Sequence, residues 1–203
     1  MLAGLHAAAS ALSTGATAAA VNANNVANIN TPGYKSTYAA LSEMLTGGVK
    51  VSAIQSNNSQ GAIYATGQPY DLAVIGKGNF GLDDGLAPVY TRNGVFSRDY
   101  AGNITDPLGR VLFHDTPHGV NIGEDGTIYN YGEAIGKIQL YDGIGAPMTQ
   151  TAQRIMSGML EMSNVSLLNE AVNQIVNLRI FQANTASVRA MNENLGTVIN
   201  MVR

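Results

Sequence analysis

The first 29 residues read MLAGLHAAASALSTGATAAAVNANNVANI, and they carry a seven-residue pattern. The apolar positions alternate spacings of three and four residues, at Leu2, Leu5, Ala9, Leu12, Ala16, Ala19, Ala23 and Val26. This spacing is typical of a coiled-coil seam sustained over roughly four heptads, and alanine favours helix more than any other residue. The sequence therefore predicts one long N-terminal helix that packs against another helix.

A turn signal ends the predicted helix. The chain reads Asn30-Thr31-Pro32-Gly33 after the last seam position. Pro32 disfavours the helical conformation at Thr31, and Pro-Gly is a preferred pair at the centre of a type II turn. We therefore expect the chain to turn at Pro32 and Gly33.

The C-terminal end of the chain also predicts a helix, from about residue 166 to residue 202. Ser166 is expected to cap its N-terminus, with Glu170 near the positive end of the helix dipole. A second seam comprises Leu178, Phe181, Val188, Leu195, Ile199 and Val202, with the polar residues Thr185 and Asn192 on the same seam. Polar seam residues lower stability but fix register and partner choice. The two terminal helices could pair with each other or with the ends of other copies.

Short β-rich runs lie between the two helices. They cover residues 48–54, 71–75, 88–91, 110–113, 127–129 and 137–141, and glycine-containing turn signals separate them at 84–85, 93–94, 102–103, 125–126 and 142–143. Short strands divided in this way indicate antiparallel pairing. The predicted fold is α+β, with N- and C-terminal coiled-coil helices flanking a central antiparallel all-β domain. We expect a core helix and turn over 1–35, a linker with extended segments over 36–70, the β domain over 71–150, and a connection and core helix over 151–203.

The composition argues against several classes of protein. Charged residues make up 12% of the chain and the net charge is −3, which does not suit a nucleic-acid-binding face. The absence of cysteine excludes disulfides and thiolate metal sites. No apolar window is long enough to span a bilayer, and no basic residue precedes the first apolar stretch, so we expect no cleaved signal peptide.

Three groups of residues resemble chemical motifs, and each has a simpler interpretation. Residues 76–81 match G-x-G-x-x-G, but the following Leu82-Asp83-Asp84-Gly85 cannot open the helix that a dinucleotide site needs. We therefore expect a glycine-rich β-turn at 76–81. His114, Asp115 and His118 lack further ligands for a metal. The acidic pairs at 83–84 and 124–125 adjoin turn glycines, where aspartate bonds to the local backbone. We expect no catalytic, metal-binding or cofactor-binding residues.

Several segments together resemble one known family. Residues 23–35 read ANNVANINTPGYK, residues 71–80 read DLAVIGKGNF, residues 90–96 read YTRNGVF, and residues 158–165 read GMLEMSNV, followed by RIFQAN at 179–184. In this order the segments resemble the bacterial flagellar rod and hook proteins, the axial family. Asn79 stands where the family has the first phenylalanine of a G-F-F element.

The resemblance implies a structural, non-enzymatic subunit of the flagellar basal body. In the family, terminal helices form the inner coiled-coil core of a hollow helical tube that transmits torque, and the β domain faces outward. The implied partners are copies of the chain, other rod or hook subunits, and the flagellar type III export apparatus. The chain length favours a rod subunit. The alternatives are a short hook-type subunit and a self-standing oligomeric module of a β domain on a coiled coil.

The resemblance and the seams also predict particular site residues. Contacts between subunits are expected at Leu5, Leu12, Asn24, Asn25, Val26, Asn28, Phe181, Asn184, Val188, Asn192, Leu195 and Ile199. Pro32 and Gly33 are expected to turn the chain from the core helix toward the outer layer. The β-domain motif comprises Gly76, Gly78, Phe80, Tyr90, Arg92, Gly94 and Phe96.

Overall fold

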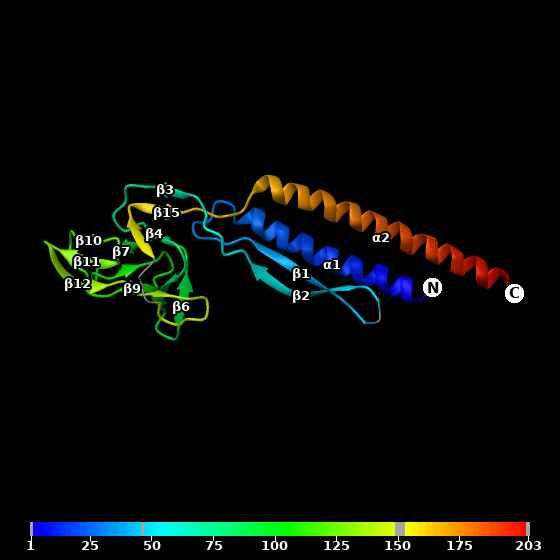
Figure 1. The fold of residues 1–203 in the computed structure, drawn as a ribbon, viewed down its shortest axis with the longest axis horizontal. Coiled ribbons are helices and arrows are strands. Elements are labelled where there is room, and N and C mark those ends of the chain that lie inside the picture. The colour runs from blue at the N-terminus through cyan, green and yellow to red at the C-terminus, as the bar shows by residue number, and fades with distance from the viewer. Residues whose placement is uncertain (1, 46, 149–152, 202–203) are drawn as a thin grey trace. The chain divides into compact units, whose positions relative to one another are not determined.

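The computed structural model describes residues 2–45, 47–148 and 153–201, and its chain forms two compact units (Figure 1). The helical unit comprises residues 1–29, 36–58 and 165–203. The β unit comprises residues 30–35 and 59–164. The predicted linker over 36–70 is therefore divided between the two units.

Two long helices form most of the helical unit. α1 spans Leu2–Ala27 and α2 spans Leu167–Met201, and they run antiparallel beside each other (Figure 1). Both helices confirm the sequence predictions to within two residues. The predicted cap is confirmed as well, because the backbone N–H of Asn169 donates to Ser166 Oγ at 3.4 Å. Neither these helices nor any other in the described ranges is long and apolar enough to cross a membrane.

The face that α1 buries within the chain is displaced from the predicted seam. α1 buries Ala8, Thr14, Asn22 and Asn25. In contrast, four seam residues are exposed: Ala9, Ala16, Ala23 and Val26. The seam residue Val202 lies outside the described residues, as does the side chain of Leu2. Half of the predicted seam is therefore available to another chain.

A β-hairpin packs along α1. β1 (Thr37–Glu43) pairs antiparallel with β2 (Val49–Ser56). Near its tip, the N–H of Val49 donates to Ser10 Oγ at 3.1 Å, and Thr14 Oγ1 donates to the carbonyl of Val49 at 3.1 Å. The hairpin thus belongs to the helical unit, because hydroxyl groups of α1 bond directly to its backbone.

The β unit consists of short antiparallel strands. The six-stranded sheet has the order β13-β5-β9-β8-β7, with β6 paired to β5, and a three-stranded sheet has the order β10-β11-β12. Two further pairs, β14-β4 and β15-β3, join the end of the unit to its beginning. The strands are β3 (Ile63–Ala65), β4 (Leu72–Ile75), β5 (Asn79–Asp83), β6 (Pro88–Thr91), β7 (Ser97–Arg98), β8 (Ile104–Thr105), β9 (Val111–Phe113), β10 (Asn121–Ile122), β11 (Thr127–Asn130), β12 (Glu133–Lys137), β13 (Leu140–Tyr141), β14 (Arg154–Ser157) and β15 (Met159–Glu161).

One apolar core holds these strands together. Its buried side chains are Leu72, Val74, Phe80, Leu82, Phe96, Ile104, Val120, Ile122, Ile128, Ile138, Leu140 and Ile155. Phe80 and Phe96 pack edge to face, with ring centroids 5.3 Å apart, a favoured geometry for aromatic pairs. The core lies wholly within the β unit, and Ile155 extends it beyond the predicted β domain over 71–150.

The β unit differs from the sequence predictions at several places, among them one predicted turn that is a strand, one that is irregular, and one predicted connection that forms two strands. Residues 76–81 were expected to be a glycine-rich turn, but β5 begins at Asn79 and lies inside the six-stranded sheet. Asn93-Gly94 was expected to be a turn, whereas it lies in an irregular segment beside Leu72, whose N–H donates to the carbonyl of Gly94 at 2.9 Å. β14 and β15 pair with strands of the β unit, although the sequence placed them in a connection to the C-terminal helix.

Candidate functional site: exposed helix surface and Glu161 cluster

Large apolar side chains remain exposed along α2. Phe181 is 47% exposed and Ile175 is 59% exposed. The other exposed apolar side chains of the helix are Leu167, Leu168, Val172, Val176, Leu178, Ile180, Ile199 and Met201. A shallow groove of about 450 Å³ runs along the helix, lined by Phe181, Gln182, Thr185, Ala186, Arg189, Ala190 and Glu193. An extended apolar surface of this kind typically marks an interaction site.

The exposed side of α1 is small and uncharged. His6 is the only residue of Leu2–Ala27 that can carry a side-chain charge. The exposed alanines Ala9, Ala16 and Ala23 repeat at heptad spacing. Small side chains let a second helix approach closely, so α1 presents a flat surface and α2 a bulky one.

Polar contacts join three elements of the helical unit near the C-terminal end of α1. The side-chain amide of Asn25 donates to Glu170 Oε1 at 3.0 Å and to the carbonyl of Thr37 at 2.8 Å. The amide of Asn22 donates to the carbonyl of Glu170 at 2.8 Å. Asn25 and Glu170 are both buried, so these bonds fix how α1, α2 and β1 meet.

The predicted contact residues occupy three kinds of environment. Asn25 is buried within the chain, and its bonds described above are to residues of the same chain. The exposed members are Asn24, Val26, Phe181, Asn192 and Ile199. The half-buried members are Leu5, Leu12, Asn28, Asn184, Val188 and Leu195. Their contacts with other subunits remain predictions.

The predicted turn after the N-terminal helix is confirmed. The N–H of Tyr34 donates to the carbonyl of Thr31 at 3.2 Å, and Gly33 has a φ of 70°. Pro32 and Gly33 therefore occupy the central positions of the turn, where a positive φ favours glycine. A Cβ on Gly33 would lie 2.3 Å from the carbonyl carbon of Arg92, so this turn packs directly on the backbone that carries Arg92.

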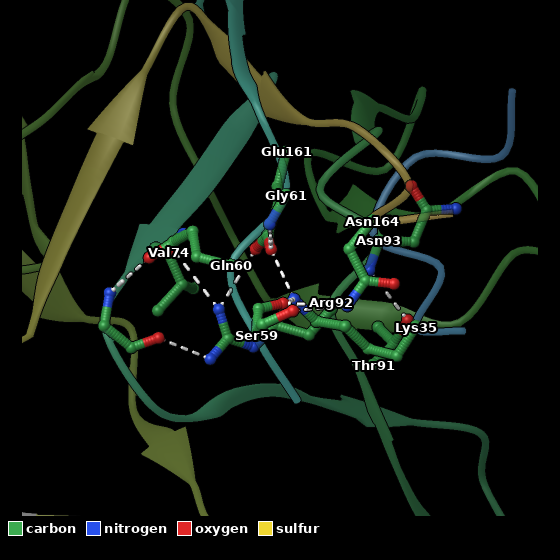
Figure 2. Close-up of polar contacts among 11 residues, drawn as sticks. Lys35, Ser59, Gln60, Gly61, Val74, Thr91, Arg92, Asn93, Glu161 and Asn164 are labelled. Atoms are coloured by element: carbon green, nitrogen blue, oxygen red, sulfur yellow. Dashed lines mark hydrogen bonds and ion pairs between the residues drawn. The ribbon is translucent and has the colours of Figure 1, made fainter. Parts of the chain in front are cut away.

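A buried carboxylate lies beside this turn. Glu161 is 1% exposed, and Figure 2 shows its side chain between Lys35 and Arg92. Lys35 Nζ donates to Glu161 Oε1, Arg92 Nη1 donates to Glu161 Oε2 at 3.1 Å, and the N–H of Gly61 donates to Oε1 at 2.9 Å. We call Lys35, Gly61, Arg92 and Glu161 the Glu161 cluster. Two cations and one backbone donor satisfy the charge that burial would otherwise penalise.

Arg92 also binds the backbone around β4. Its guanidinium donates to the carbonyl of Val74 at 3.2 Å (Figure 2) and to the carbonyl of Gly76. The side chain of Gln60 reinforces the same segment, because it donates to the carbonyl of Val74 at 2.6 Å and accepts from the N–H of Gly76 at 2.9 Å. The rigid donor fork of arginine suits this use of several acceptors at once.

The remaining residues of the predicted β-domain motif lie in or near the core. Phe80 and Phe96 are buried, and Tyr90 packs on Tyr141 with ring centroids 5.1 Å apart. Gly78 is buried with a φ of 121°, and a Cβ there would lie 3.3 Å from Leu140. The motif therefore serves the folding of the β unit.

Sequence reasoning missed the two residues at the centre of the Glu161 cluster. Lys35 and Glu161 both lie in segments that carry the family resemblance, but they are separated by more than half of the chain. A signal was present, because a single glutamate stands in the otherwise uncharged, apolar run Gly158–Met162. An isolated charge in a strand that packs on a core needs a partner of opposite sign.

The residues with possible chemical roles do not converge. His114 Nε2 lies 3.9 Å from Asp83 Oδ2, and both side chains are largely exposed. Glu124 pairs with Arg154 at 3.4 Å. Within residues 2–45, 47–148 and 153–201, no group of three or more acidic or histidine side chains is placed to hold a metal ion. The arrangement provides contacts between chain segments.

The aspartates of the turns stabilise the β unit in their ionised form. Burial opposes the ionisation of Asp106, but hydrogen bonds from the side chain and backbone of Arg110 and from the N–H of Leu108 outweigh it and lower the pKa below 3.8. The N–H of Asn103 donates to Asp99 at 2.7 Å, which lowers the pKa of Asp99. Each lowered pKa contributes stability at neutral pH that is lost in acid.

The β unit is therefore expected to lose stability as the pH falls below about 4, the ordinary aspartate value. The unfolded chain takes up protons there before the folded chain does, so the loss continues down to the lowered pKa of the folded state. Asp106→Asn should destabilise the unit by about 2 kcal/mol at pH 7 and by less at pH 3. Urea unfolding at both pH values measures the difference, and an equal loss at both values would contradict it.

The fold and the exposed helix surface are typical of subunits that assemble through their terminal helices. Comparisons with known proteins point to subunits of this kind. The family model described as flagella basal body rod protein matches residues 5–35, and that of the flagellar basal body rod FlgEFG protein C-terminal region matches residues 156–201. These two matches lie at the two ends of the chain, and they support its relationship to the flagellar rod and hook axial proteins.

Individual relatives span most or all of the chain. The flagellar basal-body rod protein FlgG of Bacillus subtilis is 26% identical, with 100% of both chains covered. The rod protein FlgF of Mesorhizobium japonicum is 28% identical over 82% of this chain and 84% of the relative. The flagellar hook protein FlgE of Salmonella typhimurium is 37% identical over 52% of this chain and 28% of its own length.

Proposed function

We propose that this chain is a structural subunit of the flagellar basal-body rod, which polymerises into a hollow helical tube that carries exported proteins and transmits torque. The exposed apolar surface of α2 is the observation that carries this proposal. Such a surface is costly for a solitary protein in water and gains stability when another chain covers it. The relationship to rod proteins supports axial subunits as the covering chains.

The alignments favour a rod subunit over a hook subunit. The relationship to the rod protein FlgG extends over all of both chains, whereas the hook relative is covered over 28% of its length. A hook protein of that length contains much that this chain lacks. We therefore place the chain in the rod, at the basal body, with export through the flagellar type III apparatus.

The terminal helices supply two surfaces that differ in size and could meet between subunits. The outer side of α1 carries Ala9, Ala16 and Ala23, and the outer side of α2 carries bulky residues such as Ile175 and Phe181. A contact between two different surfaces of identical subunits does not close on itself, so it can repeat along a filament. We propose that α1 and α2 form the coiled-coil core of the tube in this way.

Phe181→Asp is expected to abolish incorporation of the subunit into the rod. Phe181 is exposed in the separate chain, so the substitution should leave the helical circular-dichroism signal of the purified protein unchanged. In the assembly the new carboxylate would be buried without a partner, which costs several kcal/mol. Quantification of the subunit in isolated basal bodies should show at least a tenfold loss, and cells that depend on the variant should not swim.

Leu86→Asp is the matched control. Leu86 is 95% exposed in the loop between β5 and β6, and the substitution has the same chemical character. Cells that carry this variant should assemble rods and swim. Incorporation of Phe181→Asp at the level of the original protein would contradict the proposal.

A further inference from the structure

The β unit is connected to the rest of the chain at four points, and hydrogen bonds join the connections at Lys35, Ser59 and Asn164. The unit consists of Asn30–Lys35 and Ser59–Asn164, so each of its two segments has two connected ends. The side chain of Asn164 donates to the carbonyl of Ser59 at 2.9 Å, and its N–H donates to the carbonyl of Tyr34 at 3.3 Å. The ends of both segments therefore meet at one place.

The Glu161 cluster lies at this meeting point. Lys35 Nζ bonds to the carbonyl of Ser59 at 2.8 Å as well as to the Glu161 carboxylate (Figure 2). The carbonyl of Glu161 accepts from the N–H of Gly33 at 2.7 Å, and its carboxylate accepts from the N–H of Gly61. Glu161 thus binds two other segments: the one that follows α1, at Gly33, and the one that follows β2, at Gly61. Glu161 itself lies in the third segment, which leads to α2.

Burial of this charge needs a reason beyond stability. The cluster is separate from the residues that form the apolar core. A well-packed apolar group of similar volume is often as stabilising as a buried ion pair. What an apolar group cannot supply is direction, because hydrogen bonds and ion pairs hold particular atoms in one geometry.

We propose that the Glu161 cluster is a fixed joint that holds all four chain connections of the β unit together. A force applied along the terminal helices would then enter the β unit at this joint rather than pull on separate strands. The second statement rests on the proposed rod function, whereas the first concerns the isolated chain. Two experiments test them separately.

Amide hydrogen exchange of the full-length chain tests the joint. In Glu161→Gln the two cations lose their anionic partner, so the cluster should open. Exchange at the N–H groups of Gly33 and Gly61 should then accelerate at least tenfold more than exchange at Phe80 and Leu82 in β5. Equal acceleration at all four positions would overturn the proposal, since the cluster would then only support the overall stability of the unit. Unchanged rates at Gly33 and Gly61 would overturn it as well.

Two further variants keep this experiment decisive. Asp106→Asn breaks a mostly buried ion pair in the same unit that links residues four positions apart. This control should accelerate exchange at Gly33 and Gly61 no more than in β5. If Glu161→Gln does not fold, Lys35→Met replaces it, because this variant removes one of the two cations. Exchange at Gly33 and Gly61 should accelerate locally in the same way. Unchanged exchange at these two positions would overturn the proposed joint.

Swimming under load tests the path of the force. Cells that carry Lys35→Met should assemble rods but lose at least half of their speed in viscous medium relative to cells that carry Asp106→Asn. Equal speeds, together with faster exchange at Gly33 and Gly61, would reject the force path and leave the joint. Failure of the proposed rod function would instead appear as the absence of the original chain from basal bodies, with the exchange result unaffected.

Discussion

Gly94→Ala is expected to lower the free energy of unfolding of the β unit by about 3 to 5 kcal/mol, near the upper end of the range for single substitutions. A Cβ on Gly94 would lie 1.6 Å from the carbonyl oxygen of Leu72. That oxygen belongs to β4, whose Leu72 lies in the core. The strand cannot move away without disturbing both the core and the bond between Leu72 N–H and the Gly94 carbonyl.

Urea unfolding followed by tyrosine fluorescence measures this loss, since the chain has nine tyrosines and no tryptophan. Gly143→Ala is the matched control, because no atom lies within 4 Å of a Cβ at that position and its φ is not positive. The control should change stability by less than about 0.5 kcal/mol, as is usual for surface positions. Similar stability of the two variants would show that β4 adapts to the extra methyl group.

Phe80→Ala is expected to cost about 4 kcal/mol in the same measurement. Phe80 is fully buried in β5 and contacts Phe96 edge to face. β5 pairs with β6, β9 and β13, so a cavity at Phe80 weakens the packing at the centre of the six-stranded sheet. Leu108→Ala, at a largely exposed side chain, should cost little. A loss below about 1 kcal/mol at Phe80 would mean that the core collapses around the missing ring.

The terminal helices could be predicted from the sequence because their signals are local. Heptad spacing, an alanine-rich composition, the serine cap and the Pro-Gly turn each depend on neighbouring residues. The side of α1 that packs within the chain could not be predicted in the same way. It buries Asn22 and Asn25, and polar residues at a helix interface do not appear in an apolar pattern.

Most strands of the β unit that turn signals flank were predicted, whereas β5, β14 and β15 were missed for two different reasons. β5 alternates the buried residues Phe80 and Leu82 with Asn79 and Gly81, but the neighbouring glycines made the segment resemble a turn. β14 and β15 pair with β4 and β3, which lie far earlier in the chain. No local pattern identifies such partners.

The Glu161 cluster shows the same limit for the candidate site. Lys35, Arg92 and Glu161 each lie in a segment that resembles the family, and the resemblance identified those segments without showing that they meet. Arg92 was expected as part of the β-domain motif, and its side chain binds Val74, Gly76 and Glu161. The convergence follows from the pairing of β15 with β3 and from the turn at Gly33, and both depend on the tertiary fold.

The buried amides at the C-terminal end of α1 also limit slippage between the helices. If α2 slid along α1 by one heptad, about 10 Å, Asn22 and Asn25 would lose the Glu170 groups that they now bind. Asn25 would keep its bond to the Thr37 carbonyl, but each amide would lose its buried partner on α2, at roughly 1 to 3 kcal/mol apiece. The alanine-rich surface of α1 would accept α2 at many positions along its length. The few buried polar atoms select one of these positions, so α2 extends past α1 by the same length in every copy of the subunit.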